Sequence, residues 1–556
     1  MLAGRQQRLE AFLRRQRRKI QIGVFLGLAV LYAGTASNEL GGNLGGDNAQ
    51  YLLLAKALAQ GQGYVDLYLP SHPPHTKYPP MFPLLLAPFT WLGAYQLLAV
   101  HLFISFLALS VPFALAGWTR RQGYSETAAL GVLLLAATIP YYYQFLLHIL
   151  SEIPFMAFAY LTLGWMARTH SRSGARDLLI ITLAGLAALF TRTAGAALVA
   201  AVMLELLRRP ELRRLRLARI PWPAFFAAVV VLAWLGWSLR NYGAGGSSPG
   251  YVQEFLLKDA YRPEDGYAGF QELAHRFFSR AYDYLPFLAV QVTLGDFHFS
   301  INAPPYYFLP LLFVILVGIA SRWRSQEHAA EWFFIFSIMI LSLWWHNDAR
   351  FALPLLPLAS LYLLLGIRTI AGWITRGLRL ANSSSLARGS TLGLGLLILL
   401  HQGWAVAGIF LQEHTPRLEP AAPVEIQGYG TWREPVMNWA RYEGDWLSPA
   451  EVRLYTRFLI IHRIAARRVP AGRVILSRKP TLTSWFTDRP SVCYLFTENT
   501  KEQWNFLRRN QVSYVLVHAF SRKLKALFDS CPGCFRPLVY CQDDYPALYQ
   551  IVSYPE

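Results

Sequence analysis

Two carboxylates of this chain lie where a membrane protein rarely places a charge. Asp47 follows the first long apolar run of the sequence, and Glu152 immediately precedes a later one. Ionisable side chains at a membrane boundary are costly and usually serve a function. Because the charge pattern described below puts both on the same side of the membrane, we predict proton transfer on a membrane-embedded substrate. The alternative is a plain helix N-terminus, where acidic side chains are stabilised without a catalytic role.

Cations near the same apolar runs could bind an anionic group of that substrate. Lys77 lies in a proline-rich segment whose stiff backbone would hold it at the membrane surface, where a fixed cation suits a lipid phosphate. Arg240 and Arg350 end and begin apolar runs on the same face, and Arg192 lies between two short runs. Ordinary interfacial ion pairs, for instance between Arg350 and Asp348, are the alternative.

Several familiar catalytic motifs are absent from the sequence. It contains no Walker motif, Rossmann fingerprint, His-Glu-x-x-His pair or serine nucleophile elbow, which argues against an ATP-driven pump and a metalloprotease. His72, His75 and Asp47 could in principle hold a metal ion, but their spacing is not diagnostic. We therefore expect no cofactor, with a divalent metal ion as the alternative.

Composition indicates that a membrane surrounds these residues. The chain has 556 residues, of which 54% are hydrophobic and 15% charged, whereas soluble domains carry about 25% charged residues. Its formal net charge of +19 would suggest nucleic acid as the partner of a soluble protein. Here the basic residues cluster between apolar runs, as the positive-inside rule describes. We expect membrane lipids as neighbours and no nucleic acid.

Eleven apolar runs have about the length that a transmembrane helix needs. They cover residues 20–36, 98–118, 126–145, 150–167, 178–191, 193–207, 222–238, 304–321, 331–345, 351–367 and 391–411. Residues 81–97 are also apolar, but a further full span there would move the basic clusters to opposite faces. We therefore interpret residues 81–97 as a partly embedded segment that leads into the next span.

The predicted fold class is a polytopic α-helical membrane protein with about 11 transmembrane helices and a C-terminal extracytoplasmic α/β domain. The expected parts are a basic cytoplasmic N-terminus (1–19), a transmembrane domain (20–411) with outer loops 37–80 and 239–303, and the α/β domain (412–556). In this domain, alternating β-like runs and amphipathic stretches predict strands at 474–477, 514–517 and 548–552, and helices at 450–466 and 502–509.

All the cysteines lie in the predicted outer domain. They are Cys493, Cys531, Cys534 and Cys541. This placement fits an oxidising compartment and up to two disulfides, with Cys493 paired to Cys541 and Cys531 paired to Cys534 as the pairs to test. A zinc site at Cys531 and Cys534 is the less favoured alternative, because no histidine pair lies nearby.

Taken in order, these residues resemble the GT-C superfamily of membrane glycosyltransferases. The resemblance rests on Asp47 at the head of a helix in the first outer loop, Lys77 in Lys-Tyr-Pro-Pro, Glu152 in Glu-Ile-Pro-Phe, and a soluble tail. It covers about residues 20–370 and is closest to the glycosyltransferase family 39-like branch of bacterial aminoarabinose transferases and protein O-mannosyltransferases.

The resemblance implies a role for each matching residue. Asp47 is expected to be the catalytic base, and Glu152 is expected to be the second acidic residue of the catalytic site. The expected substrate-binding residues are Lys77, Arg350, Arg240, His346, Tyr51 and Tyr78. Asn48 and Gln50 replace a pair that is often charged in the family, so the contacts to donor or acceptor should differ here.

The resemblance also implies a reaction and a location. A sugar would move, with inversion, from a polyprenyl-phosphate donor to a hydroxyl of a lipid, glycan or protein acceptor, on the outer face of a bacterial inner (plasma) membrane. Two alternatives stay open, namely a transporter or flippase of lipid-linked saccharide and an oligosaccharide ligase. A transporter would predict charged residues deep inside the spans and paired repeats, and the sequence has neither.

Overall fold

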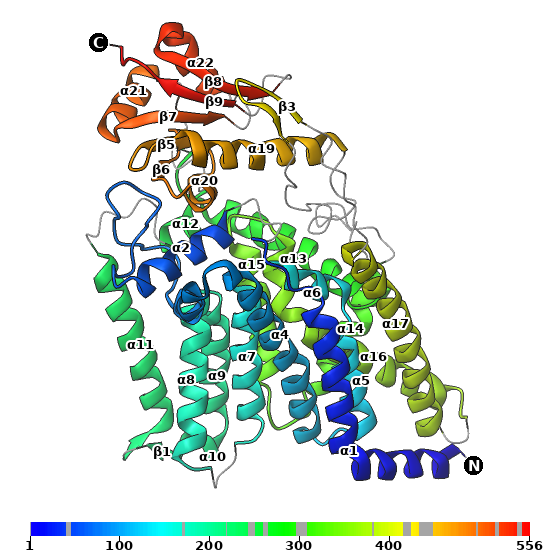
Figure 1. The fold of residues 1–556 in the computed structure, drawn as a ribbon. Helices are drawn as coiled ribbons and strands as arrows, with labels where there is room; N and C mark the ends of the chain where they lie inside the picture. Colours follow the sequence, from blue (N-terminus) through cyan, green and yellow to red (C-terminus); the bar gives the residue numbers. More distant parts are fainter. Residues whose placement is uncertain are drawn as a thin grey trace.

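The computed structural model shows a long helical bundle with a smaller sheet-containing domain at one end (Figure 1). It describes residues 2–555 apart from 41–45, 170–172, 218, 243–250, 260–264, 296–307, 381–382, 415–423, 433–448, 496, 498, 518–521 and 542–546. The N-terminus lies at the far end of the bundle from the sheet, and the C-terminus lies in the sheet-containing domain (Figure 1).

A helix lies in each apolar run identified from the sequence, because such runs satisfy their backbone hydrogen bonds internally in lipid. The helices are α1 (Leu2–Ala33), α4 (Gln96–Arg121), α5 (Glu126–Ala137), α7 (Glu152–Met166), α8 (Ala175–Thr191), α9 (Gly195–Arg208), α11 (Trp222–Asn241), α14 (Phe308–Arg322), α15 (Ala329–Leu343), α16 (Leu356–Gly377) and α17 (Ser383–His414). By length and composition, 4 helical segments of the described chain could cross a membrane, or 5 if the bent pair after α4 is one span. The chain is therefore an integral membrane protein with several spans.

Residues 81–97 form a broken helix that leads into α4. The short helix α3 (Met81–Leu86) is followed by the 3₁₀ helix η1 (Ala87–Tyr95), which breaks at Gly93 with φ 55°. The predicted outer loop 239–303 also contains helices, α12 (Tyr251–Leu256) and α13 (Phe270–Gln291). The segment 239–303 is therefore partly helical, and α13 lies entirely within it.

Helices α14 and α16 pack with their backbones in close contact. A methyl group added at Gly318 would lie 1.8 Å from the carbonyl oxygen of Tyr362, and one added at Gly366 would lie 1.9 Å from that of Val314. Small residues permit such close approach between membrane helices. These two glycines therefore fix the separation of α14 and α16.

The C-terminal domain is a mixed seven-stranded sheet in the order β4-β3-β8-β9-β7-β5-β6. Strands β5, β6 and β7 are parallel, and the remaining neighbours pair antiparallel. The strands are β3 (Val424–Gln427), β4 (Gly430–Trp432), β5 (Val474–Ser477), β6 (Ser491–Val492), β7 (Val512–Val517), β8 (Phe535–Cys541) and β9 (Ala547–Ile551). The predicted α/β character is confirmed, and the three predicted strands correspond to β5, β7 and β9.

Four helices accompany this sheet. They are α19 (Pro449–Arg468), α20 (Pro480–Thr487), α21 (Thr500–Arg509) and α22 (Arg522–Ser530). The two helices predicted from the sequence correspond to α19 and α21. Helix α17 continues to His414, slightly past the domain boundary expected at residue 412.

The C-terminal domain contacts the first outer loop through α20 and β6. The hydroxyl of Thr481 donates to the carbonyl of Gly46 at 3.1 Å, and Ser491 N–H donates to the carbonyl of Tyr68 at 2.6 Å. Lys56, on α2 (Asp47–Ala59), forms an ion pair with Asp488 at 3.1 Å. The domain is therefore docked directly on the segment that carries Asp47.

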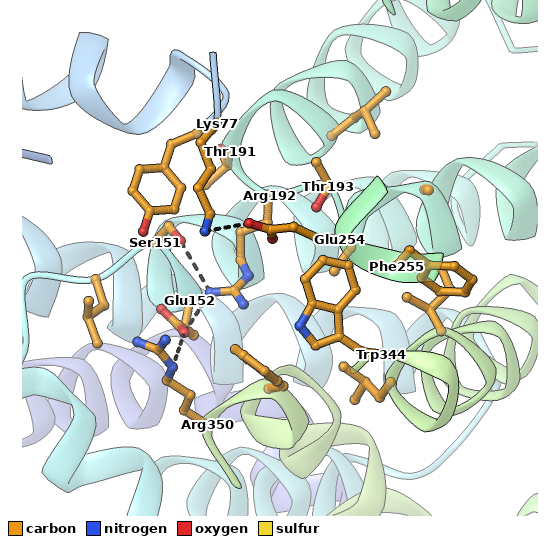
Figure 2. Close-up of a pocket in the computed structure, with 18 of the residues that line it drawn as sticks. Lys77, Ser151, Glu152, Thr191, Arg192, Thr193, Glu254, Phe255, Trp344 and Arg350 are labelled. Atoms are coloured by element: carbon orange, nitrogen blue, oxygen red, sulfur yellow. Dashed lines mark hydrogen bonds and ion pairs between the residues drawn. The ribbon is translucent and has the colours of Figure 1, made fainter. Parts of the chain in front are cut away.

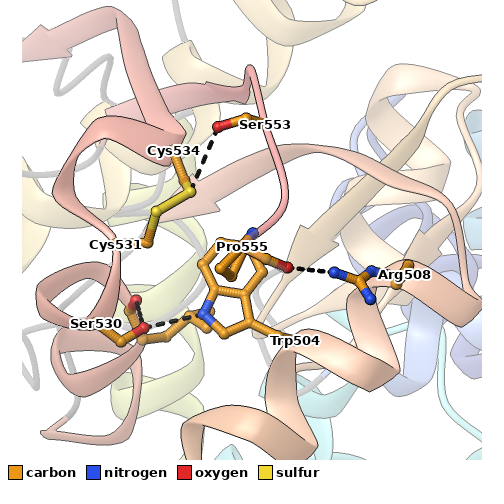
Figure 3. Close-up of a disulfide and its surroundings, with 8 residues drawn as sticks. Trp504, Arg508, Ser530, Cys531, Cys534, Ser553 and Pro555 are labelled. Carbon is orange, nitrogen blue, oxygen red and sulfur yellow. Dashed lines mark hydrogen bonds between the residues drawn. A yellow bond between two sulfur atoms is a disulfide. The ribbon is translucent and has the colours of Figure 1, made fainter.

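A disulfide joins Cys531 and Cys534 before strand β8 (Figure 3). Its surroundings are apolar, with Trp504 stacked on Phe535 at 5.3 Å between ring centres. Among the described side chains Cys493 is a free thiol, so it does not pair with Cys541, and burial raises its pKa to about 11. The side chain of Cys541 lies outside the described residues.

Candidate functional site

A cavity of about 1390 Å³ lies where the bundle meets the C-terminal domain. Part of its wall is apolar and comes from α9 and α11, through Met203, Val231 and Trp234 among others. Charged side chains from distant parts of the sequence gather at its centre (Figure 2). An apolar wall beside fixed charges suits a ligand with a hydrocarbon part and an anionic group.

Asp47 is the first residue of α2, and its position depends on a glycine. Gly46 caps the helix with φ 91°, a left-handed conformation that favours glycine. The Asp47 carboxylate accepts a hydrogen bond from the Tyr78 hydroxyl at 2.9 Å and forms an ion pair with Arg350 at 3.0 Å. Burial alone would raise the pKa of Asp47, but Arg350 and Tyr78 outweigh it and the pKa is lowered. Asp47 is therefore an ionised carboxylate that lines the cavity.

Glu152 lies between two arginines at the start of α7. Its carboxylate is 2.5 Å from Nη1 of Arg192 and 3.8 Å from Nε of Arg350, and the side chain is 1% exposed (Figure 2). Arg350 thus contacts both predicted acidic residues. A buried carboxylate held between two cations is suited to orienting them.

Lys77 lies above Arg192 and Arg350 in the view of Figure 2. Its ammonium group donates to the carboxylate of Glu254, on α12, at 2.9 Å, and Glu254 is 4% exposed. Sequence reasoning missed Glu254 because nothing in the long outer loop distinguishes it from other acidic residues there.

Three aromatic residues named from the sequence also line the cavity: Tyr51, Tyr78 and His346. The hydroxyl of Tyr51 donates to that of Ser151 at 3.0 Å, and the rings of Tyr51 and Tyr78 lie 4.9 Å apart. Burial lowers the pKa of His346, so this ring is neutral at physiological pH.

A buried aspartate and histidine hold the segment that carries Tyr78. The backbone N–H of Tyr78 donates to Nε2 of His75 at 2.8 Å. Since Nε2 must accept, the ring proton is on Nδ1, which donates to Asp66 at 2.7 Å. The amide of Gln50 donates to the same Asp66 oxygen at 2.7 Å. This network fixes Tyr78 against Asp47.

Arg240 is not brought to the cavity with the other predicted residues. It is not one of the described residues that line the cavity. Its guanidinium donates to the carbonyls of His75 and Tyr64, each at 2.8 Å, and it stacks over the Tyr64 ring. Arg240 therefore anchors the loop that bears Lys77 and Tyr78.

The chain has the fold of known membrane glycosyltransferases. No protein-family model and no curated protein sequence matches it. ArnT from Cupriavidus metallidurans, solved bound to undecaprenyl phosphate, is similar with TM-score 0.58 and 12% identity over 96% of this chain and 99% of that chain. An Archaeoglobus fulgidus oligosaccharyltransferase tethered with an acceptor peptide is similar with TM-score 0.50 and 13% identity over 91% of this chain and 69% of that chain. This is a GT-C fold. The resemblance inferred from the sequence is confirmed at the level of the fold.

In this GT-C fold, two cations that were not predicted as site residues also line the cavity. Arg192 contacts Ser151 and Glu152; its sequence position between two short spans had left both anion binding and an interfacial ion pair open. Lys479 comes from the C-terminal domain, just before α20, and burial next to Arg478 lowers its pKa. No sequence signal connects Lys479 to Asp47, because only domain docking brings them together.

Within the described residues, no group of three or more His, Cys, Asp or Glu side chains is arranged to hold a metal ion. His75 is bonded to Asp66 and Tyr78, and Asp47 to Tyr78 and Arg350. The described donors therefore offer no preformed metal centre.

Proposed function

We propose that this protein is a membrane glycosyltransferase that moves a sugar from a polyprenyl-phosphate donor to an acceptor hydroxyl. The observation that carries the proposal is the cavity in which apolar walls converge on an ionised Asp47 flanked by Arg350 and Lys77. Likeness of fold to ArnT, solved with undecaprenyl phosphate, supports a lipid-phosphate donor.

The proposed membrane arrangement follows the charge pattern of the sequence. About eleven helices would cross a bacterial inner (plasma) membrane, with residues 1–19 in the cytoplasm. The first outer loop, α12, α13 and the C-terminal domain would lie outside. This orientation is supported by the disulfide between Cys531 and Cys534, because disulfides persist in oxidising compartments.

In the proposed reaction Asp47 is the general base. The acceptor hydroxyl oxygen attacks the anomeric carbon of the donor sugar, and the bond from that carbon to the phosphate oxygen breaks. The proton of the hydroxyl passes to Asp47, and the lipid phosphate leaves with the bonding electron pair, which inverts the anomeric configuration. One base suffices because a phosphate needs no protonation to leave.

The cations around Asp47 would stabilise the charge that develops on the phosphate. Lys77, Arg192 and Arg350 lie around the same cavity, and preorganised charges aimed at a developing anion lower the barrier most. Glu152 would keep Arg192 and Arg350 in place, which is a positioning role in contrast to the catalytic role expected from the sequence.

The proposal can be tested with purified protein and radiolabelled polyprenyl-phosphate sugars. Native protein should transfer label to an acceptor or release it to water, while Asp47→Asn should do neither although it remains folded in the membrane. Normal turnover by Asp47→Asn would overturn the assignment of the base. Native protein that binds or flips these lipids without turnover would instead support a transporter.

A further inference from the structure

A second, smaller pocket of about 170 Å³ also reaches Asp47. It shares Asp47, Lys77 and Tyr78 with the large cavity, so the two spaces meet at the proposed base. The rest of its lining is polar and lies between the first outer loop and the C-terminal domain: Gly46, Gln50, Asp66, Tyr68, His75, Thr76 and Thr481.

The small pocket differs from the large cavity in size and chemistry. It is too small for a polyprenyl chain and lies below the ~300–1,000 Å³ of a typical drug-sized site, so it suits a group about as large as one sugar ring. None of its described lining residues is aliphatic. A lipid donor fits the large cavity, which leaves the small pocket to a polar molecule.

The buried side chains of this pocket present hydrogen-bond acceptors to such a molecule. Asp66 and Gln50 are 3% and 6% exposed. One oxygen of Asp66 accepts from both Gln50 and His75. Among the described residues, the other Asp66 oxygen and the Gln50 carbonyl oxygen have no hydrogen-bond donor. Acceptors beside a pocket that take no hydrogen bond from the described residues favour a ligand that supplies hydroxyl groups.

Charge argues for a neutral ligand in the small pocket. Asp47 and Asp66 both contribute carboxylates to it, and Lys77, its one lysine or arginine among the described lining residues, already contacts Glu254. A phosphorylated or carboxylated acceptor would meet like charge here, whereas sugar hydroxyls would donate to both aspartates.

We propose that this pocket is the acceptor subsite and that it takes a neutral, polyhydroxylated group such as a sugar ring. Gln50 and Asp66 accept from hydroxyls that neighbour the attacking one, which is thereby directed at Asp47. The inference rests on the proposed transferase function and deepens it. Gln50 is also one of the two positions where the sequence departs from the GT-C pattern, and the other, Asn48, is buried and bonded to the Leu40 carbonyl.

Two substitutions test the subsite without removing the base. Thr76→Trp places a large ring in the small pocket, and the structure records no side-chain hydrogen bond of Thr76 for it to break. Gln50→Leu removes the acceptor at nearly constant volume, together with the amide that donates to Asp66. Ala200→Trp on α9 is the matched control, because it fills the large cavity instead.

The assay uses the labelled donor with one of two kinds of acceptor. These are methyl glycosides and the matching sugar phosphates. We expect Thr76→Trp to reduce transfer to methyl glycosides at least ~10-fold and Gln50→Leu to raise the acceptor KM about 5-fold, the effect of one hydrogen bond. The donor KM for hydrolysis by water should stay unchanged in Thr76→Trp and rise in Ala200→Trp.

Three outcomes would overturn the subsite. They are an unchanged acceptor KM in both variants, an increase in donor KM in Thr76→Trp as large as that in Ala200→Trp, and a preference of the native protein for sugar phosphates. Each of them leaves donor turnover intact. A native protein that turns over no donor would instead refute the transferase function itself, so the two failures are distinguishable.

Discussion

At the scale of single residues, the charge of Asp47 depends on its neighbours. Burial raises its pKa, while Arg350 and the Tyr78 hydroxyl lower it further than burial raises it. The pKa therefore lies below the ordinary value of ~3.9 for aspartate. A carboxylate with a lowered pKa is ionised, and can act as a base, at any pH above ~3.9. It becomes protonated and stops acting as a base only when the pH falls through its own pKa.

Arg350→Gln should move the acid limb of the pH–rate profile upward. Without the guanidinium, burial dominates and the pKa of Asp47 rises, so transfer is lost at a higher pH than in the native protein. The measurement is kcat/KM for donor turnover between pH 3 and 8. Lys258→Gln, in an exposed ion pair with Glu272, is the control and should keep the native profile. An acid limb that stays in place in Arg350→Gln would contradict the pairing.

Glu152→Gln separates a positioning role from a catalytic one. Neutralising Glu152 leaves Arg192 without its ion-pair partner, and loss of one member of a buried pair typically costs ~3–5 kcal/mol. Arg350 keeps its ion pairs with Asp47 and Asp348. We expect a lower Tm and slower turnover. The acid limb of the pH–rate profile should still follow the pKa of Asp47. If the limb disappeared while the Tm stayed native, Glu152 would be the base.

Residue-level motifs could single out Asp47, Glu152 and Arg350, which lie where helices begin, and Lys77, which lies in a proline-rich loop. These motifs could not identify the residues that each of them contacts in the folded protein. The contact between Lys77 and Glu254 joins residues 177 positions apart, and nothing local to either residue specifies it. The same reasoning predicted that Arg240 binds the substrate, although its guanidinium donates to backbone carbonyls of the first outer loop.

At the scale of elements, apolar length was enough to locate the long helices of the bundle. Helix α13 was missed because its first half is amphipathic and charged, through Glu272, Arg276 and Arg280, so it lacks the continuous apolar run of a span. The close approach of α14 and α16 was equally hidden, since glycines are common in membrane helices whether or not they contact another backbone.

Gly366→Ala should destabilise the bundle strongly. The added methyl group would meet the Val314 carbonyl oxygen at 1.9 Å, so α14 and α16 would have to separate. We expect a lower Tm and loss of monodisperse protein in detergent. Gly372→Ala on the same helix has nothing within 4 Å and should be neutral or slightly stabilising, because alanine has the higher helix propensity. Equal behaviour of the two variants would refute the packing.

At the scale of the whole molecule, the docked C-terminal domain completes the site. It contributes Lys479 to the large cavity and Thr481 to the small pocket. The α/β character of this domain could be predicted from alternating apolar patterns. Its contact with the first outer loop could not, because it depends on complementary surfaces more than 400 residues apart.

Gly46→Ala should disrupt this docking. An added methyl group would lie 2.5 Å from the Thr481 hydroxyl, and the residue would also have to hold φ 91°. Gly61→Ala is the control for the backbone conformation alone, because Gly61 has φ 69° and an added methyl group would have nothing within 4 Å. It should cost ~1–2 kcal/mol of stability. We expect Gly46→Ala alone to release the C-terminal domain to limited proteolysis and to reduce transfer. Identical cleavage of the two variants would count against the contact.

The contact between Gly46 and Thr481 also sets the time at which the protein can become active during its synthesis. Asp47 is made before α20, because Thr481 follows Gly46 by 435 residues. A nascent chain already inserted in the membrane would bear the proposed base and most of the apolar cavity but lack one wall of the small pocket. The ribosome must therefore complete α20 before the proposed acceptor can be held, so chains that stop earlier would not transfer the lipid-linked sugar.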